Sequence, residues 1–463
     1  MQGQIKKKSF WRGWNPHALV ALGFGVAILM GSGLLMLPAA GSGGRALPWV
    51  SALFTATSAT CVTGLSVINV GTDLSLFGQI VVLVLVQLGG LGITSFGTFV
   101  LVLAGRRLSL QSEFVLVDAY GAGGVKGLRA LLVWTILLTL LFEGAGTAVL
   151  YWRYRVAGIE PGLHAGALRT LYYAVFHAVS MFCNAGFSLH SDSLCRFLHD
   201  PCYLATASVL IILGGLGFLT LYNLVTIKFW RRDLRERGRL ALHTKIVLTA
   251  TGLLLVGGTL LLLLHEWEAS LKGLPFLHKI TGAAFQAVTA HTAGANVLPM
   301  SQVSEGSRYV TSILMFIGGS PGSMAGGIKT TTLVVLVMTV YAMCRRRRET
   351  IIFSRTITNT VVRKAIVIFF LVLTLILVAF GVLLWTEAPQ GDGASRLLFE
   401  TISASTTVGL SIDTTPLLST VGRCVVILCM YIGRLGPLAV ALLISSDDEP
   451  LRIRYPEEEV VVG

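Results

Sequence analysis

The most informative feature of this 463-residue chain is how little charge it carries. Only 13% of its residues are charged, whereas an ordinary soluble domain has about 25%. Hydrophobic residues make up 54% of the chain, and its mean hydropathy is +0.76. A buried core of this size needs a polar shell, which the composition does not supply. The sequence therefore predicts an all-α polytopic membrane protein.

Groups that enzymes and redox proteins use are also missing. The chain has no HExxH sequence, no close carboxylate pair and no recognisable Ser-His-Asp grouping. Its seven cysteines include no CxxC pair, although Cys195 and Cys202 share a predicted outer loop and leave a local disulfide open. We therefore expect no enzymatic activity and no cofactor bound by this chain.

Long apolar runs are plentiful instead. A membrane-spanning helix needs about 20 mostly apolar residues, and the gaps between the runs leave no room for a soluble domain. A cleaved signal at the first run is disfavoured, because a signal's apolar region is usually about 7–15 residues long. The eight predicted spans are roughly 17–38, 76–104, 130–151, 203–229, 246–264, 309–343, 365–385 and 420–445.

The net charge of +13 comes from basic residues that gather on one side of these spans. This asymmetry predicts that both termini and the loops after spans two, four and six are cytoplasmic. It explains the basicity without nucleic-acid binding and leaves open a docking surface for a cytoplasmic partner or anionic lipid. The loop residues concerned are Arg106, Arg107, Lys126, Arg129, Lys228, Arg231, Arg232, Arg235, Arg237, Arg239, Lys245, Arg345–Arg348, Arg355, Arg363 and Lys364.

A glycine-centred motif recurs four times, once between each odd span and the even span that follows. The segment before each glycine is only about 10–13 residues long and carries a phenylalanine, which favours a re-entrant half-helix over a span. The four copies read Cys61-Val-Thr-Gly64-Leu, Cys183-Asn-Ala-Gly186-Phe, His291-Thr-Ala-Gly294-Ala and Thr406-Thr-Val-Gly409-Leu.

A second glycine motif follows each of these glycines by 24 to 28 residues. Each unit is therefore a span, a half-helix, a glycine turn and a second span, and the units are parallel because each crosses the membrane twice. We predict four such repeats (eight spanning helices and four re-entrant half-helices) around one central pore. The second motifs read QLGGLG from Gln87, ILGGLG from Ile212, FIGGSPG from Phe316 and YIGRLG from Tyr431.

These repeats set the predicted domain boundaries. Repeat 1 covers 16–105, repeat 2 covers 125–230, repeat 3 covers 240–345 and repeat 4 covers 360–446. Cytoplasmic tails are predicted at 1–15 and 447–463.

The glycine turns suit a cation filter. Extended backbone at membrane depth is tolerated only where it is buried in protein or lines water, and a dehydrated monovalent cation can satisfy its carbonyls. The copy Thr407-Val408-Gly409 matches the first three residues of the potassium-channel filter TVGYG. Ser66, Ser188, Asn296 and Ser411 replace the second glycine of that pattern, which predicts a shorter filter with fewer sites. The predicted ion-binding residues are Val62, Thr63, Gly64, Asn184, Ala185, Gly186, Thr292, Ala293, Gly294, Thr407, Val408 and Gly409.

The stretch Gly318–Lys329 looks at first like a phosphate-binding loop. In a Walker A sequence the lysine directly follows the last glycine, whereas here it comes one residue later. No strand is expected inside a span, and the segment aligns with the GGLG of other repeats. We interpret it as a break in the sixth span that gates the pore just inside the filter, with a static packing kink as the alternative. The predicted gate residues are Gly318, Gly319, Ser320, Pro321, Gly322, Ser323, Gly326, Gly327, Lys329 and Arg434.

Arg434 stands where the other repeats have Gly90, Gly215 and Gly319. A charge at membrane depth is costly and usually faces water or a partner. Below the filter it would repel cations and limit conduction. The alternative is a salt bridge, for which Glu143 and Glu400 are the candidate partners.

Together, the four glycine motifs and the interrupted sixth span resemble the Trk/Ktr/HKT superfamily of potassium and sodium transporters. The similarity runs from about residue 16 to 446 and is greatest to Ktr-type membrane subunits (KtrB), because the extra N-terminal spans of Trk-type subunits are missing. The resemblance implies that Gly64, Gly186, Gly294 and Gly409 line the filter. It also implies a homodimer in the cell (inner) membrane with one pore per protomer.

The resemblance carries further expectations about partners and ions. It implies a cytoplasmic ring of nucleotide-binding regulatory subunits of the KtrA/TrkA type, so that the nucleotide binds the partner, and Na+ as a common activator. Ala295 departs from the family, because many relatives have phenylalanine there. Serine at the first filter glycine is associated with sodium selectivity in this superfamily, so Gly64 favours potassium as the transported ion. A sodium-permeable transporter of the same architecture remains the alternative.

Overall fold

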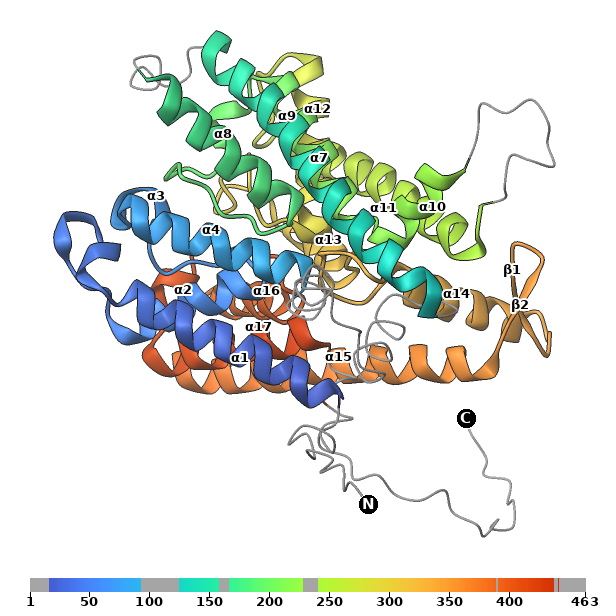
Figure 1. Cartoon of the computed structure of the whole chain (residues 1–463). Helices are drawn as coiled ribbons and strands as arrows, with labels where there is room; N and C mark the ends of the chain where they lie inside the picture. The colour runs from blue at the N-terminus through green and yellow to red at the C-terminus, as the bar shows by residue number, and fades with distance from the viewer. Residues whose placement is uncertain are drawn as a thin grey trace, which may run out of the picture.

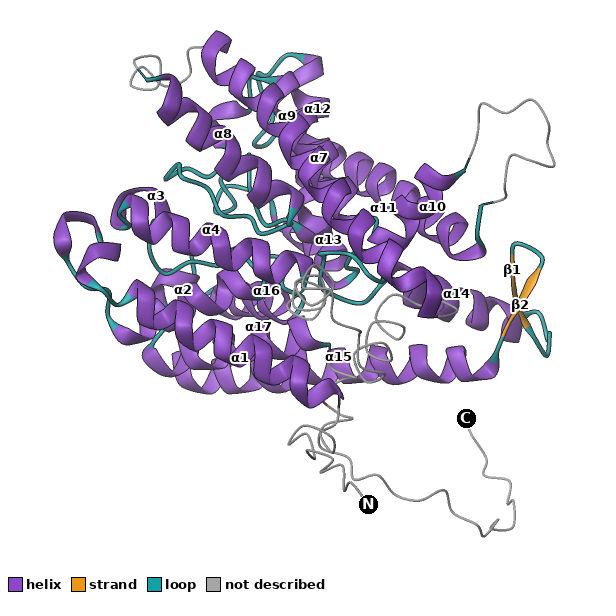
Figure 2. Ribbon diagram, in the orientation of Figure 1, coloured by secondary structure: helices purple, strands orange, loops and turns teal. Residues whose placement is uncertain are grey.

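The computed structural model describes residues 16–92, 125–157, 166–227, 240–388, 390–436 and 440. Helices dominate these residues, and one short hairpin is the only sheet among them (Figure 2). Both predicted tails, residues 93–105, 228–230 and most of 437–446 lie outside the described residues. The basic residues predicted at 106, 107, 231, 232, 235, 237 and 239 lie outside them as well.

The chain places its helices in four successive groups (Figure 1). In each group a first helix of 20 to 33 residues is followed by a helix of 12 to 17 residues, here called the short helix, and then by a second helix of 12 to 16 residues. The members of each group pack against one another. The first two groups, with α3 as a short turn of helix, are α1 (Pro16–Leu35), α2 (Trp49–Thr60), α3 (Val70–Asp73) and α4 (Leu76–Leu91), then α7 (Val125–Ala157), α8 (Ala167–Phe182), α9 (Pro201–Gly215) and α10 (Phe218–Thr226).

The third and fourth groups are joined by the hairpin, which lies at the ends of α14 and α15 (Figure 1). The third comprises α11 (Leu242–Glu266), α12 (Phe276–Thr292), α13 (Glu305–Phe316) and α14 (Thr330–Cys344). The fourth comprises α15 (Asn359–Glu387), α16 (Gly393–Ser405) and α17 (Thr420–Leu435). The antiparallel hairpin pairs β1 (Thr350–Ile352) with β2 (Arg355–Ile357). Short 3-10 turns occupy Pro38–Ala40, Ser42–Gly44, Cys195–Phe197 and Thr415–Leu417.

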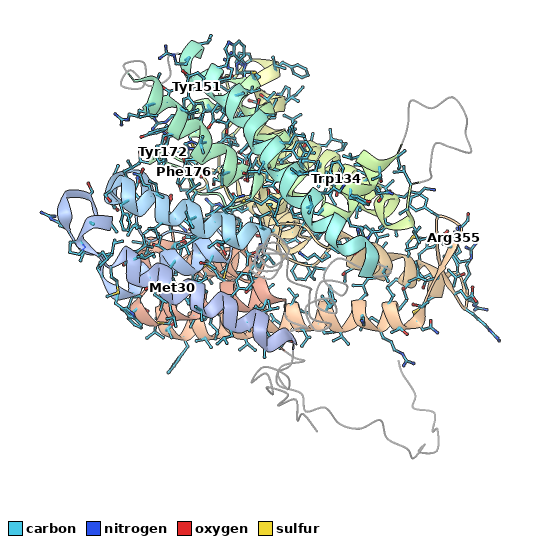
Figure 3. The ribbon with its side chains drawn as sticks, viewed as in Figure 1. Met30, Trp134, Tyr151, Tyr172, Phe176 and Arg355 are labelled. Carbon is cyan, nitrogen blue, oxygen red and sulfur yellow. The ribbon has the colours of Figure 1, made fainter. Side chains whose placement is uncertain are left out.

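Contacts between the groups close a circle. Helix α4 contacts α8, α9 contacts α12, α13 contacts α16, and α17 returns to contact α2. Each second helix therefore packs on the short helix of the next group. Tyr172 on α8, labelled in Figure 3, makes one of these joints by donating a hydrogen bond of 3.0 Å to the side-chain oxygen of Gln79 on α4.

Helix length in the described residues differs from the sequence expectation. Three helices are long and apolar enough to cross a membrane by themselves, over Val133–Val156, Leu242–Glu266 and Asn359–Glu387. Helices α9 and α10 would make a fourth span, bent by 99° at their junction. Apolar side chains such as Met30 and Trp134 are exposed on the outer surface, as expected where lipid replaces water (Figure 3).

The sequence predicts an interruption in the sixth span, and in the described residues all four second helices end at the second glycine motif. Helices α4, α9 and α17 end at Leu91, Gly215 and Leu435, as α13 ends at Phe316. The last glycine of each motif has a positive φ, which terminates a helix. These glycines are Gly92, Gly217, Gly322 and Gly436, with φ of 79°, 82°, 68° and 88°.

The first glycine of the motif allows close packing. A methyl group added at Gly89 would overlap the carbonyl oxygen of Thr60 at the end of α2. Gly214 meets Phe182 and Gly433 meets Ser405 in the same way. These glycines therefore let the second helices approach the carboxyl ends of the short helices.

Candidate functional site

The four glycine turns lie together at the centre of the circle. Each follows the carboxyl end of a short helix, and each glycine has a positive φ that L side chains rarely adopt. In each short helix a buried phenylalanine anchors the helix in the core, and the residue that follows it is a buried polar one. The glycines are Gly64, Gly186, Gly294 and Gly409, with φ of 93°, 68°, 77° and 100°, and the buried rings are Phe54, Phe176, Phe285 and Phe399.

The turns contact one another in chain order and close a ring. A methyl group added at Gly64 would lie 2.5 Å from the carbonyl oxygen of Ala185, immediately before the next glycine. The other three glycines approach their neighbour still more closely, so no side chain fits at any of the four. The carbonyl oxygens that they meet belong to Ala293, Val408 and Thr63, for Gly186, Gly294 and Gly409 respectively.

Three of the turns share one backbone conformation and the third turn differs. Val62, Asn184 and Thr407 all have left-handed backbone angles, with φ of 57°, 58° and 51°. This conformation is costly for a residue with a side chain and is typical of functional sites. In the third turn Thr292 is still the last residue of α12, and Ala293 has φ of −105°. The reason is visible in the sequence, since Phe285 stands nine residues before its glycine and the other phenylalanines stand ten before theirs.

A buried hydroxyl group tethers each turn to its short helix. Ser58 and Ser403 accept hydrogen bonds from the backbone N–H groups of Gly64 and Gly409, at 3.1 and 3.0 Å. Sequence reasoning missed these residues, although a hydroxyl recurs five or six positions before every glycine. In the other two turns the hydroxyl donates to the residue after the glycine, from Ser180 to the Phe187 carbonyl at 2.7 Å and from Thr289 to that of Ala295 at 2.6 Å.

A cavity of about 560 Å³ opens on one side of the ring, and all four glycines line it. Asp73, Asp192 and Asp413 line its walls, while no Lys or Arg of the described residues does. Partial burial alone would raise the pKa of Asp192, but the hydrogen bond and charge of Arg196, whose guanidinium lies 2.6 Å away, hold that pKa below its ordinary value. Asp192 is therefore ionised at neutral pH and paired with Arg196, so the carboxyl groups of Asp73 and Asp413 supply the rest of the acidic wall.

The interrupted segment between α13 and α14 lies against the opposite side of the ring. Gly326 approaches the carbonyl oxygen of Thr406 and the hydroxyl of Thr407 so closely that a methyl group there would overlap both. A parallel bridge pairs Ile317 with Ile328, so the segment leaves and rejoins the helix path at one point. Gly326 of the predicted gate segment therefore lies directly behind the fourth turn.

Hydrogen bonds hold this segment to the second group. The backbone N–H and the hydroxyl of Ser320 both donate to the Gly215 carbonyl, at 3.0 and 2.9 Å. Met324 N–H donates to Gly214, and the Gly322 carbonyl accepts from Phe218 at 3.1 Å. A methyl group at Gly319 would overlap the side chain of Ala325, and one at Gly217 would crowd the carbonyl of Pro321.

Arg434 and Lys329 bind backbone carbonyls of the same segment. The Arg434 guanidinium donates to the Met324 carbonyl at 2.5 Å and to the Gly89 carbonyl on α4. Lys329 donates to the Ala325 carbonyl at 2.6 Å. Within Gly318–Lys329, Ser323 accepts from Ala325 N–H, and Gly327 has a positive φ of 69°.

The alternative of a salt bridge for Arg434 does not hold among the described residues. Glu143 accepts from Gln87 at 3.4 Å and from the Cys183 thiol at 3.8 Å. Glu400 accepts from the hydroxyls of Ser411 and Thr415.

The remaining sequence candidates are two cysteines and two histidines. Cys195 and Cys202 are free, so the outer loop has no disulfide between them. His177 and His291 are buried beside the second and third turns. The described residues hold no group of three His, Cys, Asp or Glu side chains placed to bind a metal ion.

Comparison with known proteins fits this arrangement. Residues 28–450 match TrkH, a family described as cation transport proteins. The chain belongs to the TrkH family. Members of this family are transporters rather than enzymes, and with its apolar helices the chain is a multi-pass membrane protein.

Relatives in the TrkH family match almost the whole chain. It is 36% identical to the Ktr system potassium uptake protein B of Bacillus subtilis, over 98% of both chains. It is 35% identical to the potassium/sodium uptake protein NtpJ of Enterococcus hirae, over 99% of this chain and all of the relative. The crystal structure of the potassium transporter TrkH from Vibrio parahaemolyticus superposes with a TM-score of 0.70 at 19% identity, covering 96% of this chain and 87% of the other. That likeness establishes a shared fold.

Proposed function

We propose that this chain is the membrane pore subunit of a potassium uptake system. The observation that carries the proposal is the closed ring of four glycine turns, with a cavity lined by acidic side chains on one side and a glycine-rich segment on the other. Potassium would shed water in the cavity and be coordinated by the ring's carbonyls, including those of Thr63, Ala185, Ala293 and Val408.

The four-repeat architecture is part of the proposal. Each helix group would cross the membrane twice, with its short helix re-entrant, and the pore would run through the centre of the four groups. The short helices support this because they end at the ring, where their carboxyl ends carry partial negative charge. They have 12, 16, 17 and 13 residues and so extend about 18–26 Å, less than the roughly 30 Å of the hydrocarbon core.

In this proposal the segment Gly318–Lys329 gates the pore and Arg434 holds it closed. The Arg434 guanidinium donates to the carbonyls of Met324 and Gly89 and so joins the segment to α4, across the ring's inner side. Its positive charge would also shorten the stay of any cation that leaves the ring on this side.

The proposed partners follow from the relatives. A homologue named as protein B of a Ktr uptake system supports a role as the membrane subunit of a larger assembly. We propose a homodimer in the cell membrane, with both termini cytoplasmic, bound by a cytoplasmic ring of nucleotide-binding subunits. External Na+ would act as an activator.

A sodium-permeable transporter of the same architecture is the second candidate. The relative named as a potassium/sodium uptake protein, 35% identical over the whole chain, favours it. The presence of glycine at all four ring positions favours potassium, because each turn then keeps its carbonyl geometry.

Ion flux into liposomes that contain the purified protein tests the proposal and separates the two candidates. We expect potassium uptake to exceed sodium uptake by about tenfold or more, since a filter that prefers one ion by roughly 1.4 kcal/mol gives that ratio. External sodium is expected to raise the potassium rate. Comparable rates for the two ions would favour the sodium-permeable candidate. Absence of flux, both from this protein and from a variant with the gate segment shortened, would refute the pore.

A further inference from the structure

A buried polar side chain lies behind every glycine turn, one residue after the aligned phenylalanine. The residue type differs from repeat to repeat. All four side chains are at most 1% exposed. They are Thr55, His177, Gln286 and Glu400, in the order of the repeats.

In the fourth repeat this side chain reaches across to the far side of its turn. The Glu400 carboxylate accepts a hydrogen bond of 2.7 Å from the hydroxyl of Ser411 and a second one from Thr415. Ser411 is the second residue after Gly409. The carboxylate therefore joins the start of the turn, on α16, to the segment that leaves it.

In the second repeat a histidine makes the equivalent bridge. His177 Nε2 lies 3.0 Å from the hydroxyl of Ser188, the second residue after Gly186. His177 Nδ1 lies 2.8 Å from the Tyr173 carbonyl, which can only accept, so a neutral ring turns Nε2 as an acceptor toward the Ser188 hydroxyl. That hydroxyl also lies 3.0 Å from the Ser193 carbonyl and shares its single proton between the two acceptors. Tyr154 on α7 contacts the same ring at 3.2 Å and holds it from the other side.

The first and third repeats lack this bridge in the part of the chain that the structure describes. The Thr55 hydroxyl has no hydrogen-bond partner there, and Ser66 donates to Ile68 within its own loop. Gln286 donates to the sulfur of Met300, while the amide of Asn296 donates to the Leu298 carbonyl.

We propose that Glu400 and His177 are positioning residues that set ion selectivity by bracing two of the four turns. This inference rests on the proposed function. Because the turns meet in the order Gly64, Gly186, Gly294, Gly409, the braced second and fourth turns lie opposite each other. The ring is then rigid across one diagonal and compliant across the other.

The physical consequence concerns the width of the ring. A binding constellation discriminates only if its groups stay within about 0.5 Å of the productive geometry. Two opposite turns fixed by buried hydrogen bonds hold one diameter of the ring at a constant value. Loss of either bridge would let that diameter adapt to a smaller ion. The sodium flux would then rise by a larger factor than the potassium flux falls.

The test compares serine-to-alanine variants at equivalent positions of different repeats. Ser411→Ala and Ser188→Ala each remove one bridge together with hydrogen bonds inside their own loops, and Ser66→Ala is the matched control, since its hydroxyl bonds only its own loop. We expect the ratio of potassium to sodium flux in liposomes to fall on the order of tenfold in the two bridge variants and to change less than about twofold in the control. A ratio is informative because general misfolding lowers both fluxes together.

Glu400→Gln provides a second, isosteric route to the same bridge. The amide replaces one acceptor oxygen with an NH2 donor and so weakens the bridge; the flux ratio should fall, and the double variant with Ser411→Ala should fall no further than Ser411→Ala alone. Unchanged ratios in the bridge variants, or an equal fall in Ser66→Ala, would overturn the inference. If the unmodified protein itself shows no preference for potassium, the proposed function has failed instead.

Discussion

Deletion of Gly322–Gly326 is expected to raise cation flux through the protein by about tenfold or more. The deletion removes the carbonyls of Met324 and Ala325, which bind Arg434 and Lys329, and removes Gly326 from beneath the fourth turn. Each hydrogen bond contributes about 0.5–1.5 kcal/mol, and a loss of roughly 1.4 kcal/mol shifts a closed–open equilibrium tenfold. The shortened connection from Pro321 to Gly327 can no longer cover the ring.

The control for this deletion keeps the segment at full length. Thr206→Ala leaves the segment untouched and removes only a hydroxyl that donates to the Cys202 carbonyl within α9, so its flux should match that of the unmodified protein. Flux is measured in liposomes after size-exclusion chromatography and thermal unfolding show that both variants are folded. Unchanged or lower flux in a folded deletion variant would show that the segment is not the gate.

Substitution of Gly409 by serine is expected to reduce the preference for potassium over sodium on the order of tenfold. Gly409 combines a φ of 100° with the closest approach of the four turns to the next carbonyl, that of Thr63. A β-carbon must therefore push the first turn away and strain its own backbone, at about 1–3 kcal/mol for the strain alone. The carbonyls of two neighbouring turns move, and the ring loses its fit for one ion.

The matched control for Gly409→Ser is Gly391→Ser. Gly391 also has a positive φ, of 60°, but nothing lies within 4 Å of an added β-carbon. In this control the serine strains its own backbone but meets no neighbouring atom. The preference of the protein for potassium over sodium should therefore not change. Both variants are measured as potassium and sodium flux ratios. An unaltered ratio in Gly409→Ser would remove the fourth turn from the filter.

Much of the fold could be predicted from the sequence, because the repeated motifs are short stretches of consecutive residues. A glycine at the end of a short apolar segment and a second glycine motif 24 to 28 residues later recur four times, and the packing of α17 on α2 closes the order that they suggest. The one-residue shortening of the third turn was visible in the position of Phe285. Its structural consequence, that Thr292 is still the last residue of α12, could be found only from the backbone angles of the structure.

Other features depend on contacts that a sequence does not reveal. Helices α4, α9 and α17 end at the second glycine motif because Gly92, Gly217 and Gly436 adopt positive φ, yet the apolar run continues past each of them. Arg434 was expected to repel ions or to pair with a carboxylate. Its actual partners are two carbonyls from different groups, Met324 and Gly89, which lie 110 and 345 residues away along the chain.

The acidic wall of the cavity beside the ring likewise depends on folding. Asp73, Asp192 and Asp413 come from three different loops, and none belongs to a recognisable motif. Only the closure of the ring brings these loops to one side of it.

Anomalous diffraction from crystals of this protein grown in rubidium chloride tests the central claim most directly, because Rb+ substitutes for K+ and marks its own position. We predict a peak inside the ring of Gly64, Gly186, Gly294 and Gly409, within coordination distance of the neighbouring carbonyl oxygens. The peak should be absent or weakened in Gly409→Ser crystals grown in the same salt. An ordered ring without any peak, while Rb+ occupies other sites in the same crystal, would contradict the account.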